Sequence, residues 1–394
     1  MPVLQENALA YPFVRVNVVP PPAPRVSRNP GVIAIVGKTP DGDAGGDAPV
    51  NAPRVVSSAA DAITRFAKRT AAGTDAPTQL SRSLELALRQ NPGPSKVYGV
   101  RVKGNDYAAA LAALEAVDDV TFVSLAKEAD VAALAALRGH VEKASAGGAK
   151  RIGVAMVDPA RALSQTWAKD TVTGLKPAGG TVMSDDSRMI VVAGRAATMD
   201  LAPDFASAAM AAIAGLEPQV SPVLKQVRGT PIPKELQFSP SEIKELALEG
   251  VIPIIDPELI SGEGQYMADG VLFTGDTNRP YVDIVRVLDD IEFKLRAGLI
   301  GTIGDARITR PGLTLIKSVA EGILGVLQRR AVIDSFTVTI PILEILSLPD
   351  NARTSADNDE INKARTTRQI DMVATVVYGP QVHQIGVRFQ MTYV

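Results

Sequence analysis

The segment Gly31-Val32-Ile33-Ala34-Ile35-Val36-Gly37 decides the fold class, because it has the pattern of a strand buried on both faces. Similar apolar runs recur along the chain, and stretches with helical spacing separate them. The expected strands are residues 32–36, 96–102, 120–125, 151–157, 189–192 and 251–255. The expected helices are residues 59–67, 80–89, 107–116, 131–143, 163–171, 205–214 and 240–249. This alternation predicts an α/β layer domain with a largely parallel sheet.

The pattern changes after residue 274. An amphipathic helix is expected to begin near Pro280, and a second one follows Thr309-Arg310-Pro311, where proline suits the first helical turn. The apolar stripe of the first helix comprises Ile284, Val287, Leu288, Ile291 and Leu295. The stripe of the second helix comprises Leu315, Ile316, Val319, Ile323, Val326 and Leu327. Strands are expected at 335–340, 370–378 and 385–394, with a polar, charged stretch at 350–368 between the first two.

Both ends of the chain carry strands with strict alternation. The apolar residues at the C-terminal end are Ile385, Val387, Phe389, Met391 and Tyr393, and polar residues or glycine separate them. Near the N-terminus, Val14, Val16 and Val18 share one face and precede the stiff Pro20-Pro21-Pro22-Ala23-Pro24 segment. Such terminal strands suit exchange between neighbouring subunits. The pattern alone favours a different interpretation, in which both strands complete the chain's own sheet.

Composition excludes several classes of function. The chain has no cysteine, which removes disulfides, thiolate nucleophiles and cysteine-based zinc sites. It has 41 basic and 43 acidic residues, so no basic excess indicates a nucleic-acid or anionic-membrane partner. No apolar stretch approaches the roughly 20 residues that span a bilayer. The N-terminal sequence lacks the layout of a signal peptide, so synthesis in the cytoplasm without a signal is expected.

The chemical motifs are weak. Gly37-Lys38-Thr39 resembles part of a phosphate-binding loop, but the upstream glycine has the wrong spacing and a turn, not a helix, follows. Asp41, Asp43 and Asp47 lack the glutamate that an EF-hand needs at its twelfth position. The histidines, His140 and His383, lie far apart and outside any nucleophile motif. We therefore predict no catalytic, cofactor-binding or metal-binding residue, and no cofactor.

The order of several segments resembles the contractile tail sheath family, known from phage tails and related injection particles. The first matching segment is Pro30–Gly37 with the following Pro53-Arg54-Val55-Val56-Ser57-Ser58 and the helix that reaches Phe66. The second is the helical sequence from Arg279-Pro280-Tyr281 to Glu292, with the helix and strands that follow it. The resemblance covers most of the chain in order, and its specific residues cluster in residues 30–105 and 275–394. The middle departs from the family pattern at Ala202-Pro203-Asp204 and at residues 267–270.

The resemblance implies an α/β outer domain inserted between terminal segments that form an inner domain. The implied boundaries are an arm at 1–28, the outer domain at 29–274 and the inner sheath domain at 275–394. Family members polymerise as a six-start helix of hexameric rings around an inner tube, and they contract without nucleotide. Implied partners are other copies, the tube protein, and baseplate and tail terminator proteins, without direct nucleic-acid contact or membrane insertion. The implied location is a virion tail or another contractile particle.

The resemblance also assigns roles to residues. It favours exchange of the two terminal strands, so Val14, Val16 and Val18, with Ile385 to Tyr393, would pair with neighbours. Tube contact is expected from a charged stretch that could instead face solvent. Its residues are Asp357, Asp359, Glu360, Lys363, Arg365 and Arg368. An α/β enzyme, or another self-assembling particle such as a shell protein, remains the alternative to a sheath subunit.

Overall fold

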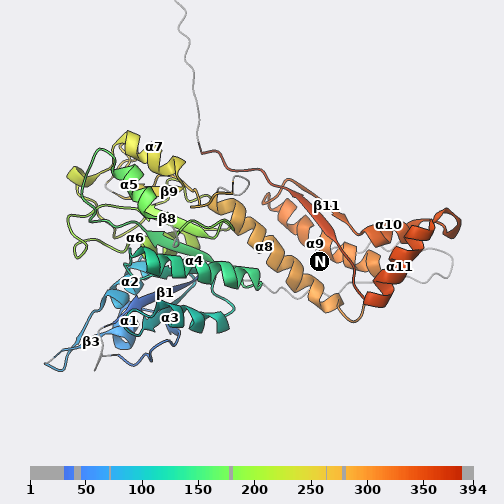
Figure 1. The fold of residues 1–394 in the computed structure, drawn as a ribbon, viewed down its shortest axis with the longest axis horizontal. Coiled ribbons are helices and arrows are strands. Elements are labelled where there is room, and N and C mark those ends of the chain that lie inside the picture. Colours follow the sequence, from blue (N-terminus) through green and yellow to red (C-terminus); the bar gives the residue numbers. More distant parts are fainter. Residues whose placement is uncertain are drawn as a thin grey trace, which may run out of the picture.

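The computed structural model describes residues 31–39, 46–70, 72–176, 181–262, 264–276 and 281–383 (Figure 1). Its centre is an eight-stranded sheet in the order β10-β9-β8-β7-β6-β1-β5-β2. These strands are β1 (Val32–Lys38), β2 (Arg54–Val56), β5 (Lys96–Val102), β6 (Phe122–Leu125), β7 (Ile152–Met156), β8 (Met189–Ala193), β9 (Val251–Ile255) and β10 (Tyr266–Met267). The six strands from β5 to β9 in this order pair in parallel, and the edge strands β2 and β10 pair antiparallel. The predicted fold class is confirmed.

Helices cover both faces of this sheet, as parallel strands with buried faces require. One face packs against α1 (Ala59–Phe66), α2 (Gln79–Leu88) and α6 (Phe205–Ala214). The opposite face packs against α3 (Tyr107–Ala113), α4 (Val131–Ala146), α5 (Trp167–Gly174) and α7 (Pro240–Leu248). A small hairpin of β3 (Lys68–Arg69) and β4 (Asp75–Ala76) follows α1. We call residues 31–276 the α/β unit.

Side-chain caps explain where many of these helices begin. Thr78 and Ser239 each form a capping box with the residue three positions later, so Ser239 rather than Ser241 caps α7. Asp106, Asp130 and Asp204 accept a backbone N–H at the starts of α3, α4 and α6. Each cap satisfies an N–H group that has no partner inside the helix.

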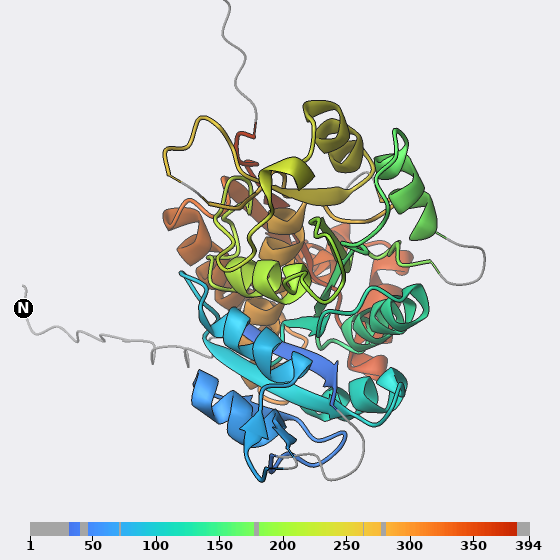
Figure 2. The same ribbon diagram turned by 90° about the vertical axis from the view of Figure 1, so that its left-hand side faces the viewer.

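The remaining residues form a second, elongated part, which we call the C-terminal unit, residues 282–377. It contains α8 (Val282–Leu299), α9 (Arg310–Arg329), β11 (Ser335–Thr339), α10 (Pro341–Ser347), α11 (Ser355–Thr367) and β12 (Val373–Val377). Figure 1 shows α8 running from the α/β unit toward the far end, where α10 and α11 lie. After a quarter turn, the α/β unit lies in front of the C-terminal unit (Figure 2).

Single-turn 3-10 helices complete the described structure. They are η1 (Leu114–Ala116), η2 (Lys234–Leu236), η3 (Ile300–Thr302) and η4 (Asp350–Ala352). Of these, η3 joins α8 to the loop before α9.

Two predictions for the C-terminal unit are wrong in detail. The charged stretch at 350–368, for which no helix was predicted, contains α11, because Thr354 and Asp357 form a capping box and Ile361 and Ala364 are buried. The stripe of α8 shifts along the helix: Leu288 is 44% exposed, while Val282 and Val285 are buried in the core of the α/β unit. Similarly, Leu315 and Val326 of α9 are exposed, and its buried residues are Leu313, Ala320, Leu324 and Leu327.

Candidate assembly surfaces

The β11–β12 sheet is the most conspicuous feature of the C-terminal unit. It has two antiparallel strands, with Phe336 opposite Val376 and Thr337 opposite Thr375. Its inner face, which includes Val338, packs against Leu324 and Leu327 of α9 and Val287 of α8 in one core. On the outer face of β12, Val373 and Val377 are 54% and 50% exposed. The sheet therefore has a covered face and a partly apolar open face.

The same sheet leaves both of its long edges open. Within the described residues, β11 and β12 pair only with each other, so the outer edge of each strand has no strand beside it. A two-stranded ribbon is marginally stable in water, and an open edge is a template for another strand. The terminal strands predicted at Val14–Val18 and at Ile385–Tyr393 lie outside the described residues.

The residues after β12, Tyr378 to His383, return to the α/β unit, and we call them the C-terminal strap. The Tyr378 hydroxyl donates to Asp283 Oδ2 of α8 at 2.8 Å. Burial and this carboxylate raise the pKa of Tyr378, so the hydroxyl stays protonated. Gln381 bonds to the backbone at Gln219 (2.6 Å), and the His383 ring packs edge-on against Tyr281 at 4.9 Å. The strap thus ends beside the start of α8.

A polar joint holds α8 to the α/β unit. Arg286 is buried, and its guanidinium donates to the carbonyl oxygens of Leu216 (2.6 Å) and Glu217 (3.3 Å). Burial lowers the pKa of Arg286 to about 10, which leaves it charged at neutral pH. Nearby, Arg188 forms a double hydrogen bond with Asp289. These bonds fix the direction of α8 relative to the sheet, because fork-shaped guanidinium contacts are geometrically specific.

The predicted apolar stripe of α8 does not include the residues of this joint. Asp283 and Arg286 are charged, yet they are only 2% and 5% exposed. One signal in the sequence was available. Val282 and Val285 lie off the predicted stripe, so the first two turns of α8 are apolar nearly all round, which indicates burial on more than one side.

The charged residues predicted for tube contact lie at the far end of the C-terminal unit. Asp359, Glu360, Lys363 and Arg365 are exposed on α11, and Arg368 is exposed directly after this helix. Helical spacing puts Asp359, Glu360 and Lys363 on one side and Arg365 on another. The described residues offer none of them an oppositely charged partner within 4 Å. These side chains are therefore exposed charges with no ion-pair partner among the described residues.

Asp357 differs from the rest of this set. Its carboxylate accepts the backbone N–H of Thr354 at 2.8 Å, and the Thr354 hydroxyl also donates to it. These bonds, the backbone bond first, lower the pKa of Asp357. The residue therefore helps to start α11, a role that its place in the charged stretch did not indicate.

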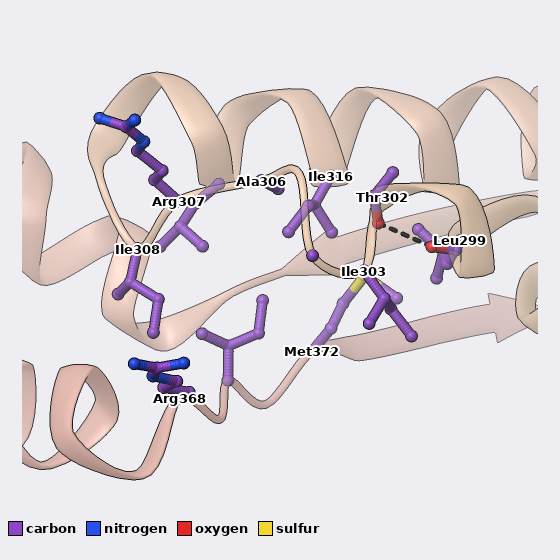
Figure 3. Close-up of a pocket in the computed structure, with 12 residues that line it drawn as sticks. Leu299, Thr302, Ile303, Ala306, Arg307, Ile308, Ile316, Arg368 and Met372 are labelled. Atoms are coloured by element: carbon purple, nitrogen blue, oxygen red, sulfur yellow. Dashed lines mark hydrogen bonds between the residues drawn. The ribbon is translucent and has the colours of Figure 1, made fainter.

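A cavity of about 310 Å³ lies where α8, the loop before α9 and the chain before β12 meet (Figure 3). Its wall combines polar and apolar surface, and the apolar residues include Leu299, Ile303, Ile308, Ile316 and Met372. Arg307 and Arg368 also border it. Figure 3 shows the Arg368 guanidinium beside Ile308 at one end of the cavity, while the Arg307 guanidinium points away.

The α/β unit has one position at which enzymes of this fold class bind ligands. In such folds, ligands bind at the carboxyl ends of the strands where the strand order reverses, here between β1 and β6. The polar groups at this point contact one another: Lys38 pairs with Glu128 at 2.8 Å, and the Tyr107 hydroxyl donates to Glu128 at 2.7 Å. The cavity described above, at the end of α8, is not at this edge.

Metal and triad chemistry gain no support from the described residues. Within the six described ranges, no three histidine, aspartate or glutamate side chains gather closely enough to hold a metal ion. Asp41 and Asp43 lie outside those ranges, and Asp47 faces Arg65 at 3.9 Å. His140 is buried and accepts from Arg151 at 2.9 Å, which is a structural role. None of the described helices is long and apolar enough to cross a membrane.

No model of a known protein family matches the chain, and neither does any curated protein. Solved structures do match over nearly the whole length. The PVC sheath complex of an extracellular contractile injection system, in the contracted state, gives a TM-score of 0.68 at 13% identity and covers 98% of each chain. The chain has the fold of a contractile injection system sheath protein.

Two further structures have the same sheath-like fold. The anti-feeding prophage helical sheath in the contracted state matches with a TM-score of 0.64 and 14% identity, covering 97% of this chain and 99% of that one. The anti-feeding prophage baseplate matches with a TM-score of 0.65 and 13% identity, covering 98% of this chain and 100% of that one. These matched chains come from sheath and baseplate assemblies.

Proposed function

We propose that this protein is the sheath subunit of a contractile tail or tail-like injection particle. The observation that carries the proposal is the β11–β12 sheet, which has two open edges and an outer face bearing exposed Val373 and Val377. The open edges of such a sheet can pair with further strands through main-chain hydrogen bonds. The likeness of the whole chain to sheath structures supports the same conclusion.

The added strands, in this proposal, are the arms of neighbouring copies. One copy supplies the segment with Val14, Val16 and Val18, and another supplies Ile385, Val387, Phe389, Met391 and Tyr393. Main-chain hydrogen bonds provide the affinity, and the alternation of apolar residues sets the register, since a slip by one residue exposes every apolar side chain.

The proposed assembly has an outer and an inner layer. The arm at 1–28 and residues 275–394, which include the C-terminal unit, form the inner layer around a tube. Residues 29–274, which make up most of the α/β unit, face outward. Copies form hexameric rings in a six-start helix that meets baseplate and tail terminator proteins. Contraction needs no nucleotide, because the contracted lattice buries more surface. The proposed tube contacts are Asp359, Glu360, Lys363, Arg365 and Arg368. Each charge pair of this kind is weak, so the contacts could break as the sheath slides along the tube.

Negative-stain electron microscopy tests the proposal directly. The full chain and a chain ending at Gln384 are expressed alone and imaged at the same concentration. We expect tubes or stacked rings from the full chain and their loss from the truncated chain. Small uniform particles from both proteins would exclude a sheath linked by its C-terminal strand. Closed shells would favour a different self-assembling particle.

A matched pair of point variants gives a sharper control than truncation. Phe389→Lys places a charge on the apolar face of the terminal strand, whereas Gln390→Lys places it on the opposite face. We expect Phe389→Lys to abolish polymers and Gln390→Lys to leave them. Equal behaviour of the two variants would contradict pairing with the predicted register.

A further inference from the structure

Three leucines of the α/β unit are exposed at one edge of the central sheet. Leu163, Leu201 and Leu259 are 58%, 74% and 99% exposed, and they lie in the loops that follow β7, β8 and β9. These neighbouring strands are parallel, so all three loops leave the carboxyl edge of the sheet. A hydrogen bond from the Ala196 N–H to the Pro159 oxygen, at 2.9 Å, joins the first two loops. We call residues 157–166, 194–204 and 256–262 the leucine edge.

The leucine edge lies on the side of the sheet that is remote from the C-terminal unit. Helix α8 lies at the opposite, amino edge of the sheet. There Arg188, directly before β8, bonds to Asp289, and Lys150, shortly before β7, pairs with Glu292 at 3.1 Å. The described part of the C-terminal unit therefore leaves the leucine edge open. Exposed apolar side chains that gather at one edge are typical of an interaction surface.

The charges of the leucine edge are mainly negative. Asp158, Asp256 and Glu258 lie in its loops, and the described residues place no lysine, arginine or histidine within 4 Å of their carboxylates. Asp200 adds a fourth carboxylate, and Arg161 is an exposed cation in the same loops. A partner that fits this edge therefore presents apolar side chains together with a basic one, because charges across an interface are complementary.

A surface of this complementary kind lies at the other end of the same sheet, where β2 is the edge strand. Val50 and Val55 are 44% and 42% exposed there. Arg54 is exposed, and among the described residues no carboxylate lies within 4 Å of its guanidinium. Asp47, an acid of the same flank, already pairs with Arg65 at 3.9 Å. We call Val50, Arg54, Val55 and the exposed Lys68 of β3 the β2 edge.

One copy cannot bring these two surfaces together. In the sheet, β9 lies six strands from β2, a separation of about 29 Å at the usual strand spacing. In Figure 2, the blue elements that include β2 lie at the bottom of the α/β unit, and the yellow elements around β9 lie toward its top. A contact between the two edges therefore needs two copies. Because the two edges differ, the contact is head-to-tail, and repeated contacts of this type form rings or helices.

We propose that the leucine edge of one copy docks on the β2 edge of a neighbouring copy, with Glu258 facing Arg54. The proposal rests on the self-assembly of the proposed function and adds a contact between α/β units that does not use the terminal strands. Burial of the leucines and valines provides the affinity. The opposite charges select the orientation, since two leucine edges would repel each other.

Engineered cysteines locate the contact, because the chain has none of its own. Leu259→Cys is combined with Val55→Cys in the full chain, and the polymers are oxidised mildly. We expect a ladder of disulfide-linked multimers on a non-reducing gel. The control combines Val55→Cys with Leu248→Cys, because Leu248 is 78% exposed but precedes β9 and so lies toward the amino edge of the sheet. Ladders of equal yield from the two pairs would overturn the proposal.

Single cysteines identify other occupants of these surfaces. Leu259→Cys alone gives a cross-linked dimer when two leucine edges meet, and Val55→Cys alone does so when two β2 edges meet. Either dimer as the main product would contradict the proposal. Polymers without a Leu259–Val55 ladder would overturn the contact and leave the proposed function intact. A chain that forms neither polymers nor cross-linked multimers would contradict both.

An exchange of charges tests the orientation. Glu258→Arg and Arg54→Glu, each in the paired-cysteine chain, place like charges opposite each other, so we expect at least a fivefold lower ladder yield. The two substitutions together restore opposite charges and should recover at least half of the yield. All these side chains are exposed, so the melting temperature should not change. Glu245→Arg, at an exposed position of α7, is the control and should keep the full yield. A combined variant that recovers no more than the single variants would overturn the pairing of Glu258 with Arg54.

Discussion

Arg188, immediately before β8, forms two hydrogen bonds with Asp289 of α8, at 2.6 and 3.0 Å. The side chains are only 7% and 14% exposed, so this pair lies inside the joint between the α/β unit and α8. Removal of one partner leaves a buried charge without compensation. We expect Asp289→Ala to lower the free energy of unfolding by about 3 kcal/mol, measured by urea denaturation.

A surface pair serves as the control for this prediction. Glu85 of α2 and Arg89, directly after this helix, are 32% and 64% exposed, and exposed pairs contribute about 0–1 kcal/mol. Glu85→Gln should therefore shift the urea midpoint far less than Asp289→Ala. Equal shifts would mean that the joint does not depend on the Arg188–Asp289 pair.

His140 makes stability depend on pH. Its Nε2 accepts from Arg151, and burial, with the Arg151 charge, lowers the pKa of His140 to about 4. The unfolded chain binds this proton near pH 6.5, so the contribution to stability is present above pH 6.5 and is lost as the pH falls toward 4. Between pH 7 and pH 5, we expect a loss of about 2 kcal/mol.

His140→Gln tests this assignment, because glutamine keeps a neutral acceptor for Arg151. Urea denaturation at several pH values should show a smaller decline between pH 7 and 5 in this variant. His383→Gln controls for the second histidine of the chain and should keep the steeper decline. If His140→Gln had the slope of the unmodified protein, another group would be responsible.

Two glycines should respond in opposite directions to alanine. A Cβ on Gly99 would lie 2.5 Å from the buried ring of Phe66, so Gly99→Ala overpacks the core and should cost about 1–3 kcal/mol. Gly139 lies inside α4 with no heavy atom within 4 Å of the added Cβ. Gly139→Ala should therefore stabilise by about 0.5–1 kcal/mol. Thermal unfolding of both variants checks the sign of each change.

Substitutions in α11 can distinguish an effect on folding from an effect on tube contact. Asp357→Ala removes the carboxylate of the capping box and should lower the melting temperature. Glu360→Gln and Lys363→Gln alter exposed charges and should leave the melting temperature unchanged. If these charges contact the tube, they should weaken co-sedimentation with the tube protein in a salt-dependent way. Binding unaffected by both substitutions would remove this helix from the tube interface.

The α/β unit was predictable because its signals are local. The runs of apolar residues at 96–102 and 251–255 coincide with β5 and β9, and α6 has the predicted bounds. Each buried parallel strand is apolar on both faces, and each adjoining helix has a cap or a clear period. The antiparallel edge strands β2 and β10 escaped prediction, since two or three residues carry no period.

The C-terminal unit was less predictable because its cores depend on contacts distant in sequence. The sequence around Asp283 does not predict its contact with Tyr378, which lies 95 residues later. Similarly, the cavity joins Ile303 to Met372, so no single segment contains its pattern. The charged set was recognised, but its division into the helix-starting Asp357 and the outward Asp359 follows only from the backbone that they form.

The helix α8 belongs to two cores at once: Val282 and Val285 lie in that of the α/β unit, and Val287 and Ile291 lie in that of the β11–β12 sheet. Turning one unit against the other would shear both packings and break the Arg286 and Arg188 contacts. We therefore expect the α/β unit and the C-terminal unit to move together as one rigid body. In the proposed sheath lattice, a change of length would then be absorbed in the linkages between copies rather than by bending within a copy.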